Sequence, residues 1–181
     1  EENFKFINAY LQRVGPVIQD NHGFVNQYFG DGLMALFTQL PDDALDAAIG
    51  MQLEILKYNI ARAQKGRAPI QAGIGLHLGK LMLGIIGDEN RNDTGILSDA
   101  VNTASRLEGL TKLFGASILL SENTLDKIKN PSKYHFRFLG QVQVKGKANL
   151  IKIYECLDGY SSELILLKQE TLGDFDDGLS A

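Results

Sequence analysis

The sequence has few of the residues that would support a disulfide framework, a histidine metal site or a membrane span. It contains one cysteine among 181 residues, Cys156, so no internal disulfide can form. Its three histidines, at positions 22, 77 and 135, are scattered without metal-ligand spacing. No apolar run approaches the roughly 20 residues that cross a bilayer, and no charged-then-apolar leader opens the chain. We therefore expect a soluble, cytoplasmic domain that does not insert into a membrane.

Basic residues are scarcer than acidic ones. The chain has 18 lysines and arginines against 22 acidic residues, which gives a net charge of -4 at pH 7. A nucleic-acid-binding protein normally has a basic face, so we expect no nucleic-acid partner. A nucleotide ligand remains compatible, because a few local cations are enough to hold a triphosphate. With 44% hydrophobic residues, the chain is long enough for one well-packed domain.

Hydrophobic periodicity predicts helices interspersed with pairs of short strands. The predicted elements are a helix over 1–19, strands over 24–29 and 33–37, a helix over 43–60 capped by Asp43, strands over 70–78 and 80–87 that turn at Gly79, a polar, flexible stretch over 88–93, a helix over 98–114, a strand over 117–120, a helix from 121, and strands over 134–144 and 150–156. This order indicates an α+β domain with helices packed on an antiparallel sheet. A strand before the first helix would complete the βαββαβ order of a ferredoxin-like core.

The helix over 98–114 has clear boundary signals and two candidate functional side chains. Ser98 is a favourable N-cap residue, and Gly115 is a favourable C-terminal stop. Asn102 and Arg106 are four residues apart, so they project from one face of the helix about one turn apart. An amide beside a guanidinium is suited to orient a sugar and to neutralise an oxyanion. An ordinary solvated helix face would have the same composition.

Two turns carry further candidates. Asp31 stands between glycines in the turn of the first strand pair, where it is either a solvated turn residue or a carboxylate aimed at a divalent cation such as Mg²⁺. Lys145 lies in a Lys-Gly-Lys loop between the last two strands, where it is either surface charge or a contact to phosphate groups. Both explanations stay open for each residue.

Other nucleotide and catalytic motifs do not fit. The stretch GIGLHLG over 73–79 has glycines like those of a dinucleotide fingerprint, but its third glycine falls one residue late and a strand is predicted after it. No P-loop sequence occurs, and neither a serine nor Cys156 lies in a nucleophile-elbow context. These observations disfavour a Rossmann fold, a P-loop enzyme and a serine or cysteine hydrolase.

Four stretches, taken in order, resemble the class III adenylyl and guanylyl cyclases. They are GFVNQYFGDGLMALF (23–37), GIGLHLGKLMLGIIG (73–87), SDAVNTASRLEGLTKLFG (98–115) and VKGK (144–147). The V-N-x-A-x-R element in the third stretch is specific to that family. The resemblance implies a ferredoxin-like α+β core with extra C-terminal strands over residues 1–157. Residues 158–181 then form a helical tail, which either packs on its own domain or connects to a downstream module.

The resemblance implies a cyclase reaction and assigns roles by position. In this family the ribose 3′-hydroxyl of a nucleoside triphosphate attacks its own α-phosphate, pyrophosphate leaves, and two divalent ions, Mg²⁺ or Mn²⁺, assist. Asp31 matches a metal-binding aspartate, and Lys145 matches a lysine that contacts the triphosphate. Asn102 matches the residue that orients the ribose, and Arg106 matches the arginine that stabilises the transition state. Family sites lie between two domains, so a head-to-tail homodimer with shared sites is expected.

The chain departs from the family pattern in three respects: a missing strand, the pair of base-reading residues, and the residue before the third helix. Another metal aspartate of the family lies on a strand before the first helix, so we expect this chain to be part of a longer protein and to lack that strand. Gln27 stands where adenylyl cyclases have an adenine-reading lysine, and Gly95 stands at the partner base-reading position. This pair selects neither purine clearly, and ATP is favoured only weakly over GTP. Ser98 stands where a glycine is expected.

Two functional hypotheses follow. One is a nucleotide cyclase active in signal transduction, with this chain alone impaired by its missing strand. The other is a catalytically silent pseudocyclase that serves as a dimerisation or nucleotide-sensing module. A diguanylate cyclase is disfavoured, because FGDG at 29–32 differs from the G-G-[DE]-E-F signature.

Overall fold

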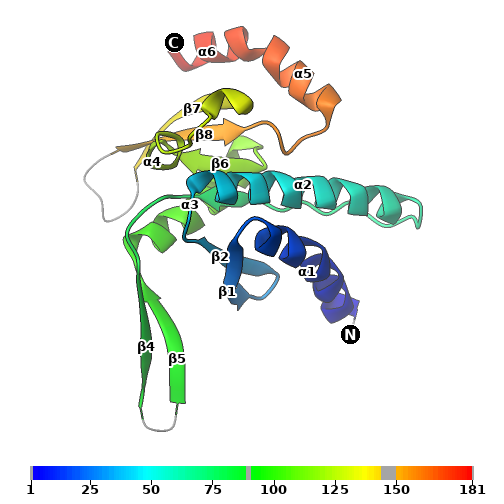
Figure 1. Ribbon diagram of the computed structural model, residues 1–181. Coiled ribbons are helices and arrows are strands. Elements are labelled where there is room, and N and C mark those ends of the chain that lie inside the picture. The colour runs from blue at the N-terminus through cyan, green and yellow to red at the C-terminus, as the bar shows by residue number, and fades with distance from the viewer. Residues whose placement is uncertain (1, 89–90, 144–149, 181) are drawn as a thin grey trace.

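The computed structural model describes residues 2–88, 91–143 and 150–180 (Figure 1). Its helices and strands, in order, are α1 (Glu2–Asp20), β1 (Gly23–Phe29), β2 (Gly32–Phe37), α2 (Pro41–Ala63), β3 (Ile74–Leu76), β4 (Met82–Asp88), β5 (Arg91–Leu97), α3 (Asp99–Phe114), β6 (Ile118–Ser121), α4 (Glu122–Leu125), a 3-10 turn (Pro131–Lys133), β7 (Phe136–Gln143), β8 (Leu150–Cys156), α5 (Ser162–Glu170) and α6 (Leu172–Ser180). The predicted α+β class is confirmed.

The described strands form three hydrogen-bonded sheets. A four-stranded sheet has the order β3-β6-β8-β7, in which β3 and β6 are parallel and the other pairs are antiparallel. Strands β1 and β2 pair as an antiparallel hairpin, and so do β4 and β5. The β4–β5 hairpin projects away from the body of the domain (Figure 1). The main sheet is therefore mixed, whereas the sequence pattern predicted an antiparallel one.

The predicted hairpin that turns at Gly79 is wrong. Strand β3 ends at Leu76 and pairs with β6, whereas β4 pairs with β5 in a register that sets Met82 opposite Leu97. The physical reason is packing: Ile74 and Leu76 are needed beside the buried Ile118 and Leu120 in the domain core. The polar stretch 88–93, predicted to be a flexible connection, includes the end of β4 and the start of β5.

Helices α1 and α2 cover the β1–β2 hairpin. Val14 and Ile18 of α1 and Met51 of α2 form a buried cluster with apolar residues of both strands. Asp43 supports the start of α2 from inside the helix, because its Oδ2 accepts a hydrogen bond from the Leu40 N–H at 3.2 Å. The residue at the N-cap position is Leu40, so the predicted capping role of Asp43 is right but its position in the helix is different.

The two C-terminal helices pack on the β7–β8 side of the main sheet (Figure 1). Phe175 of α6 packs against a buried cluster that includes Leu119, Leu139 and Ile153. Lys168 of α5 reaches the fully buried Glu155 of β8, with 2.7 Å between Nζ and Oε1. In the described part of the chain, no helix is long and apolar enough to span a membrane.

Candidate functional site

Helix α3 lies directly on strand β3 because glycines remove the side chains between them. A Cβ atom at Gly75 would overlap the backbone of Ala104 and Glu108, and one at Gly79 would lie 2.7 Å from the Cβ of Ala100. Ordinary packing does not permit contacts this short. The glycines of the GIGLHLG stretch are therefore the surface on which α3 rests. The sequence pattern disfavours a dinucleotide site there, but it does not reveal this packing role of the glycines.

This packing fixes which face of α3 is available to a ligand. Ala100, Thr103, Leu107 and Thr111 are the buried positions of the helix. Asn102 is exposed and Arg106 is half-buried, and helical spacing places Asp99 on their face. Within the described residues, the side chains of Asn102 and Arg106 make no hydrogen bond or ion pair. A half-buried guanidinium without an internal anion is available for an external one.

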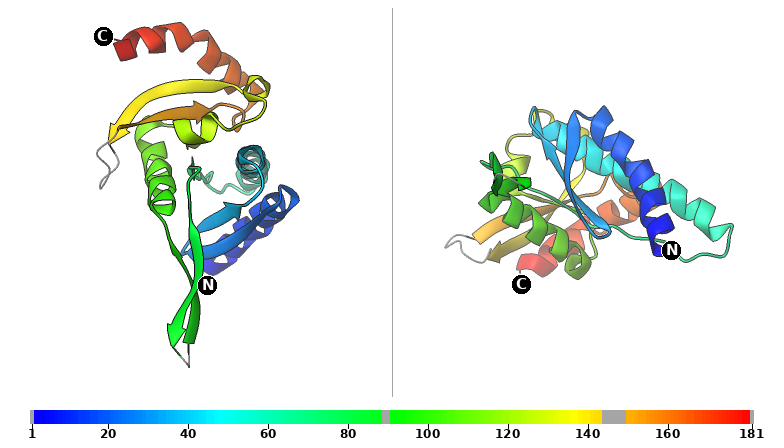
Figure 2. Two further views of the ribbon diagram at one scale, coloured as in Figure 1. Left: turned by 60° about the vertical axis from the view of Figure 1, so that its left-hand side comes forward. Right: turned by 90° about the horizontal axis from the view of Figure 1, so that it is seen from below.

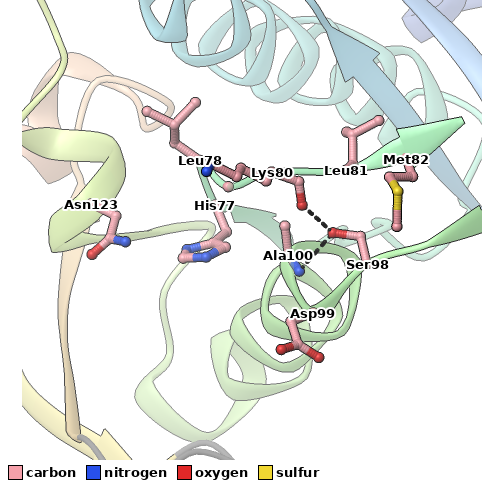
Figure 3. Close-up of a pocket in the computed structure, with 10 residues that line it drawn as sticks. His77, Leu78, Lys80, Leu81, Met82, Ser98, Asp99, Ala100 and Asn123 are labelled. Atoms are coloured by element: carbon pink, nitrogen blue, oxygen red, sulfur yellow. Dashed lines mark hydrogen bonds between the residues drawn. The ribbon is translucent and has the colours of Figure 1, made fainter.

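A cavity of about 490 Å³ opens at the N-terminal end of α3 (Figure 3). It is lined by His77, Leu78, Gly79, Lys80, Leu81, Met82, Ser98, Asp99, Ala100 and Asn123. A hydrogen bond restrains the His77 ring, because its Nδ1 lies 2.7 Å from the Oγ of the buried Ser121. Asp99 lines the cavity and also shares a helix face with Asn102 and Arg106, so the cavity adjoins that face.

Asp31 and Gln27 lie on a different part of the domain. Asp31 is an exposed residue in the β1–β2 turn, next to Gly30, whose positive φ of 64° makes the turn tight. Burial, and then the negative charge of Asp31, raise the pKa of Tyr10 on α1, so the carboxylate is close enough to α1 to influence it. Gln27 is exposed on β1, directly after a register shift that follows Val25. This irregularity was not predicted from the sequence.

One chain does not bring all the predicted site residues together. Asn102 and Arg106 lie on α3, which contacts β3 and β6, whereas the hairpin with Gln27 and Asp31 packs on α1 and α2. Figure 1 and both views of Figure 2 show α3 and this hairpin as separate parts of the domain. Gly95 lies in β5 opposite Gly84 of β4. The remaining residue, Lys145, lies outside the described residues.

Comparison with known proteins places this arrangement in a family. A sequence model of the adenylate and guanylate cyclase catalytic domain matches residues 2–174. The chain belongs to this family. The α+β architecture agrees, since a solved structure of the guanylyl cyclase Cya2 superposes with a TM-score of 0.71 at 28% identity, over 86% of this chain and 80% of that one.

Curated relatives of the cyclase domain are longer proteins. An adenylate cyclase of Anabaena cylindrica is 41% identical over 160 residues, which are 85% of this chain and 32% of that protein. A terminal-differentiation specific adenylate cyclase of Dictyostelium discoideum is 33% identical over 180 residues, which are 96% of this chain and 8% of that protein. The chain thus spans a third or less of the length of these two relatives.

Proposed function

We propose that this cyclase domain converts a nucleoside triphosphate into a 3′,5′-cyclic nucleotide and pyrophosphate for signal transduction. The observation that carries the proposal is the outer face of α3, where Asn102 and Arg106 stand one turn apart and their side chains make no hydrogen bond or ion pair with other described residues. ATP is favoured weakly over GTP, in keeping with the adenylate cyclases among its relatives.

The reaction requires that the 3′-hydroxyl is oriented and that the negative charge developing on the phosphate oxygens is stabilised. An intramolecular attack needs the 3′-hydroxyl held near the α-phosphate, and the Asn102 amide can donate to and accept from a ribose to hold it. As the phosphorus–oxygen bond to pyrophosphate breaks, negative charge grows on the phosphate oxygens. Arg106 is suited to bind those oxygens, because its guanidinium stays charged and can donate to two acceptors at once. Lys145 is assigned to the triphosphate by its position in the sequence.

Asp31 fits the binding of a divalent cation. Mg²⁺ binds through one or two protein carboxylates and takes its other ligands from phosphates and water, so one exposed carboxylate on a tight turn is a suitable contribution. Among the described residues, no three His, Cys, Asp or Glu side chains converge on one point, which suits an ion held largely by its nucleotide. Two such ions, Mg²⁺ or Mn²⁺, would neutralise the triphosphate and lower the pKa of the attacking hydroxyl.

A shared site between two copies follows from the separation of these residues. If Asp31 and Arg106 serve one nucleotide, and one chain holds them on different parts of the domain, a second copy must supply one of them. A head-to-tail homodimer meets this requirement twice and forms two equivalent sites. We assign residues 1–157 to the cyclase domain and 158–181 to a helical tail. The docking of Lys168 and Phe175 supports a tail that packs on its own domain.

A silent pseudocyclase is the second candidate, and the base-reading positions favour it. Gln27 offers both a donor and an acceptor, and Gly95 offers no side chain, so the pair does not distinguish adenine from guanine. A domain that binds nucleotide without turnover would still dimerise and sense nucleotide.

The test uses the purified full-length protein with ATP or GTP and Mg²⁺ or Mn²⁺, and measures cyclic nucleotide. We expect product that chelation of the metal abolishes, and a loss of about 10²- to 10³-fold in kcat for Arg106→Ala, the size expected for removing one charge-stabilising group. Arg67→Ala, on an exposed loop, is the matched control and should leave kcat unchanged. An inactive wild-type protein that dimerises and melts at a higher temperature with nucleotide would instead establish the pseudocyclase.

Mixing two inactive variants tests the shared site. In a head-to-tail dimer of one Asp31→Asn and one Arg106→Ala chain, one site carries both substitutions and the other carries neither. Equal mixing and random pairing should therefore restore about one quarter of wild-type activity. No recovery after confirmed subunit exchange would contradict a site shared in this way.

A further inference from the structure

We propose that the Ser98 hydroxyl is a positioning group for Asn102 and Arg106, acting as a clasp between the start of α3 and the segment that leads into β4. The inference rests on the proposed cyclase function, because that function gives Asn102 and Arg106 their roles. Ser98 lies between β5 and α3 and lines the cavity at the N-terminal end of the helix.

One oxygen atom makes both contacts of the clasp. Ser98 Oγ accepts a hydrogen bond from the Ala100 N–H at 3.0 Å and donates one to the Lys80 carbonyl at 2.6 Å (Figure 3). The first bond caps the helix. The second adds nothing to capping and ties the helix to a segment 18 residues earlier in the chain. A hydroxyl has one proton and two lone pairs, so it makes both bonds at once, whereas alanine or glycine makes neither.

The backbone of Ser98 connects the clasp to Asn102. The Asn102 N–H donates to the Ser98 carbonyl across 3.5 Å, which is longer than a typical helical hydrogen bond. The shorter bonds of the Ser98 hydroxyl are therefore the firmer anchors of the first turn. Arg106 lies one turn beyond Asn102, so a shift of the first turn moves both side chains relative to a bound nucleotide.

Gly79 supports the same turn by direct contact. A Cβ atom at this position would lie only 2.7 Å from the Cβ of Ala100, so the chain at 79–80 runs against the first turn of α3. Contact prevents the helix from moving toward this chain, and the hydroxyl bond prevents it from moving away. The two constraints together fix the distance between the helix and the base of the β4–β5 hairpin.

The backbone of Ser98 explains why a side chain is tolerated where the family pattern leads one to expect glycine. Its φ of -161° and ψ of 132° are those of extended backbone, which any residue adopts. Glycine is therefore not required here for conformational reasons. The hydroxyl adds a constraint on α3 that a glycine at this position would lack.

The experiment compares Ser98→Ala and Ser98→Thr with wild-type full-length protein, using kcat and KM for the nucleotide with Mg²⁺ or Mn²⁺. We expect Ser98→Ala to lower kcat by about 10- to 100-fold, as a small misplacement of catalytic groups does, with less than about a threefold change in KM. Ser98→Thr keeps the hydroxyl and should stay within about threefold of the wild-type kcat.

Ser161→Ala is the matched control, because Ser161 caps α5 by accepting from the Leu164 N–H and α5 carries no candidate site residue. Both alanine variants lose one N-cap and should unfold at slightly lower temperature, but only Ser98→Ala should lose kcat. A Ser98→Ala enzyme within twofold of wild type, or an equal loss in Ser161→Ala, would overturn the proposal.

Amide hydrogen exchange separates failure of the clasp from failure of the proposed function. Ser98→Ala should raise exchange at least about tenfold in the first turn of α3 and also in residues 80–82, whereas Ser161→Ala should change neither. If the wild-type protein makes no cyclic nucleotide, the proposed function fails and exchange alone decides the clasp. Unchanged exchange in Ser98→Ala would then refute it.

Discussion

Removing the negative charge of Glu155 should destabilise the domain strongly, because this fully buried carboxylate on β8 holds two cations. Its Oε2 accepts from Arg137 Nε at 2.9 Å and Nη2 at 2.6 Å, and its Oε1 accepts from Lys168 Nζ and from the Tyr160 hydroxyl at 2.7 Å each. The side chains of Arg137 and Lys168 are only 10% and 15% exposed. The Glu155→Gln substitution leaves both cations without an anionic partner among the described residues, and their burial restricts compensating hydration.

The size of the effect follows from this burial. Breaking a buried ion pair costs about 3–5 kcal/mol, mainly because the remaining charge is desolvated and unpaired. Glu155→Gln should therefore lower the free energy of unfolding by about this amount and lower Tm by roughly 10 °C for a chain of this length. Lys168→Met should cost less, because Arg137 keeps its partner, and should mainly loosen α5 and α6 from β8.

Urea unfolding followed by circular dichroism measures both variants. Glu122→Gln is the control, because Glu122 pairs with Lys152 at 2.6 Å with 36% and 43% of the two side chains exposed. An exposed pair of this kind contributes about 0–1 kcal/mol, so this variant should unfold close to wild type. A Glu155→Gln domain that loses less than about 1 kcal/mol would refute the assignment of Glu155 as the counterion on which both cations depend.

Two further outcomes test the packing of α3 and the ionisation of a buried tyrosine. Gly75→Ala should cost about 1–3 kcal/mol of unfolding free energy and most of the activity, because its Cβ overlaps α3, whereas Gly109→Ala on the open side of α3 should not destabilise. Equal stability of the two variants would contradict the tight contact. Burial, and then the hydrogen bond to Asp46, raise the pKa of Tyr134 from 10.0 to about 12, so its contribution to stability is complete below pH 10 and lost between pH 10 and 12. Tyr134→Phe should reduce this loss when the free energy of unfolding is measured by urea unfolding at several pH values. If the free energy of unfolding falls equally with pH in wild type and variant, the prediction is contradicted.

Features set by neighbouring residues could be predicted from the sequence. Helix α3 starts after Ser98 and ends at Gly115, as predicted, because each residue acts on the backbone beside it. Ser98 caps the first turn, and Gly115 adopts φ 60° at the C-terminus. The β1–β2 hairpin was predicted for the same reason, since two apolar runs flank a short turn that contains Gly30.

Strand partners and glycine roles could not be predicted, because both depend on segments far away in the chain. The parallel pairing of β3 with β6 sets Ile74 opposite Ile118, although β4, β5 and α3 all lie between these two strands in the sequence. Local alternation cannot distinguish this pairing from a hairpin at Gly79. The role of Gly75 is visible only when α3 lies on it. Helical spacing did place Asn102 and Arg106 on one face, and their chemical roles stay a prediction.

The packing of α3 separates residues that hold the helix from residues that can serve a ligand. Its inner face leaves no room for a Cβ atom at Gly75, so a substitution there should change stability and activity together. Its outer face carries Asn102 and Arg106, which make no internal hydrogen bond or ion pair among the described residues. Loss of either side chain should therefore lower activity with little change in unfolding free energy. A stable but inactive Arg106→Ala protein would indicate a lost ligand contact, whereas an unstable one would mean that Arg106 supports the fold.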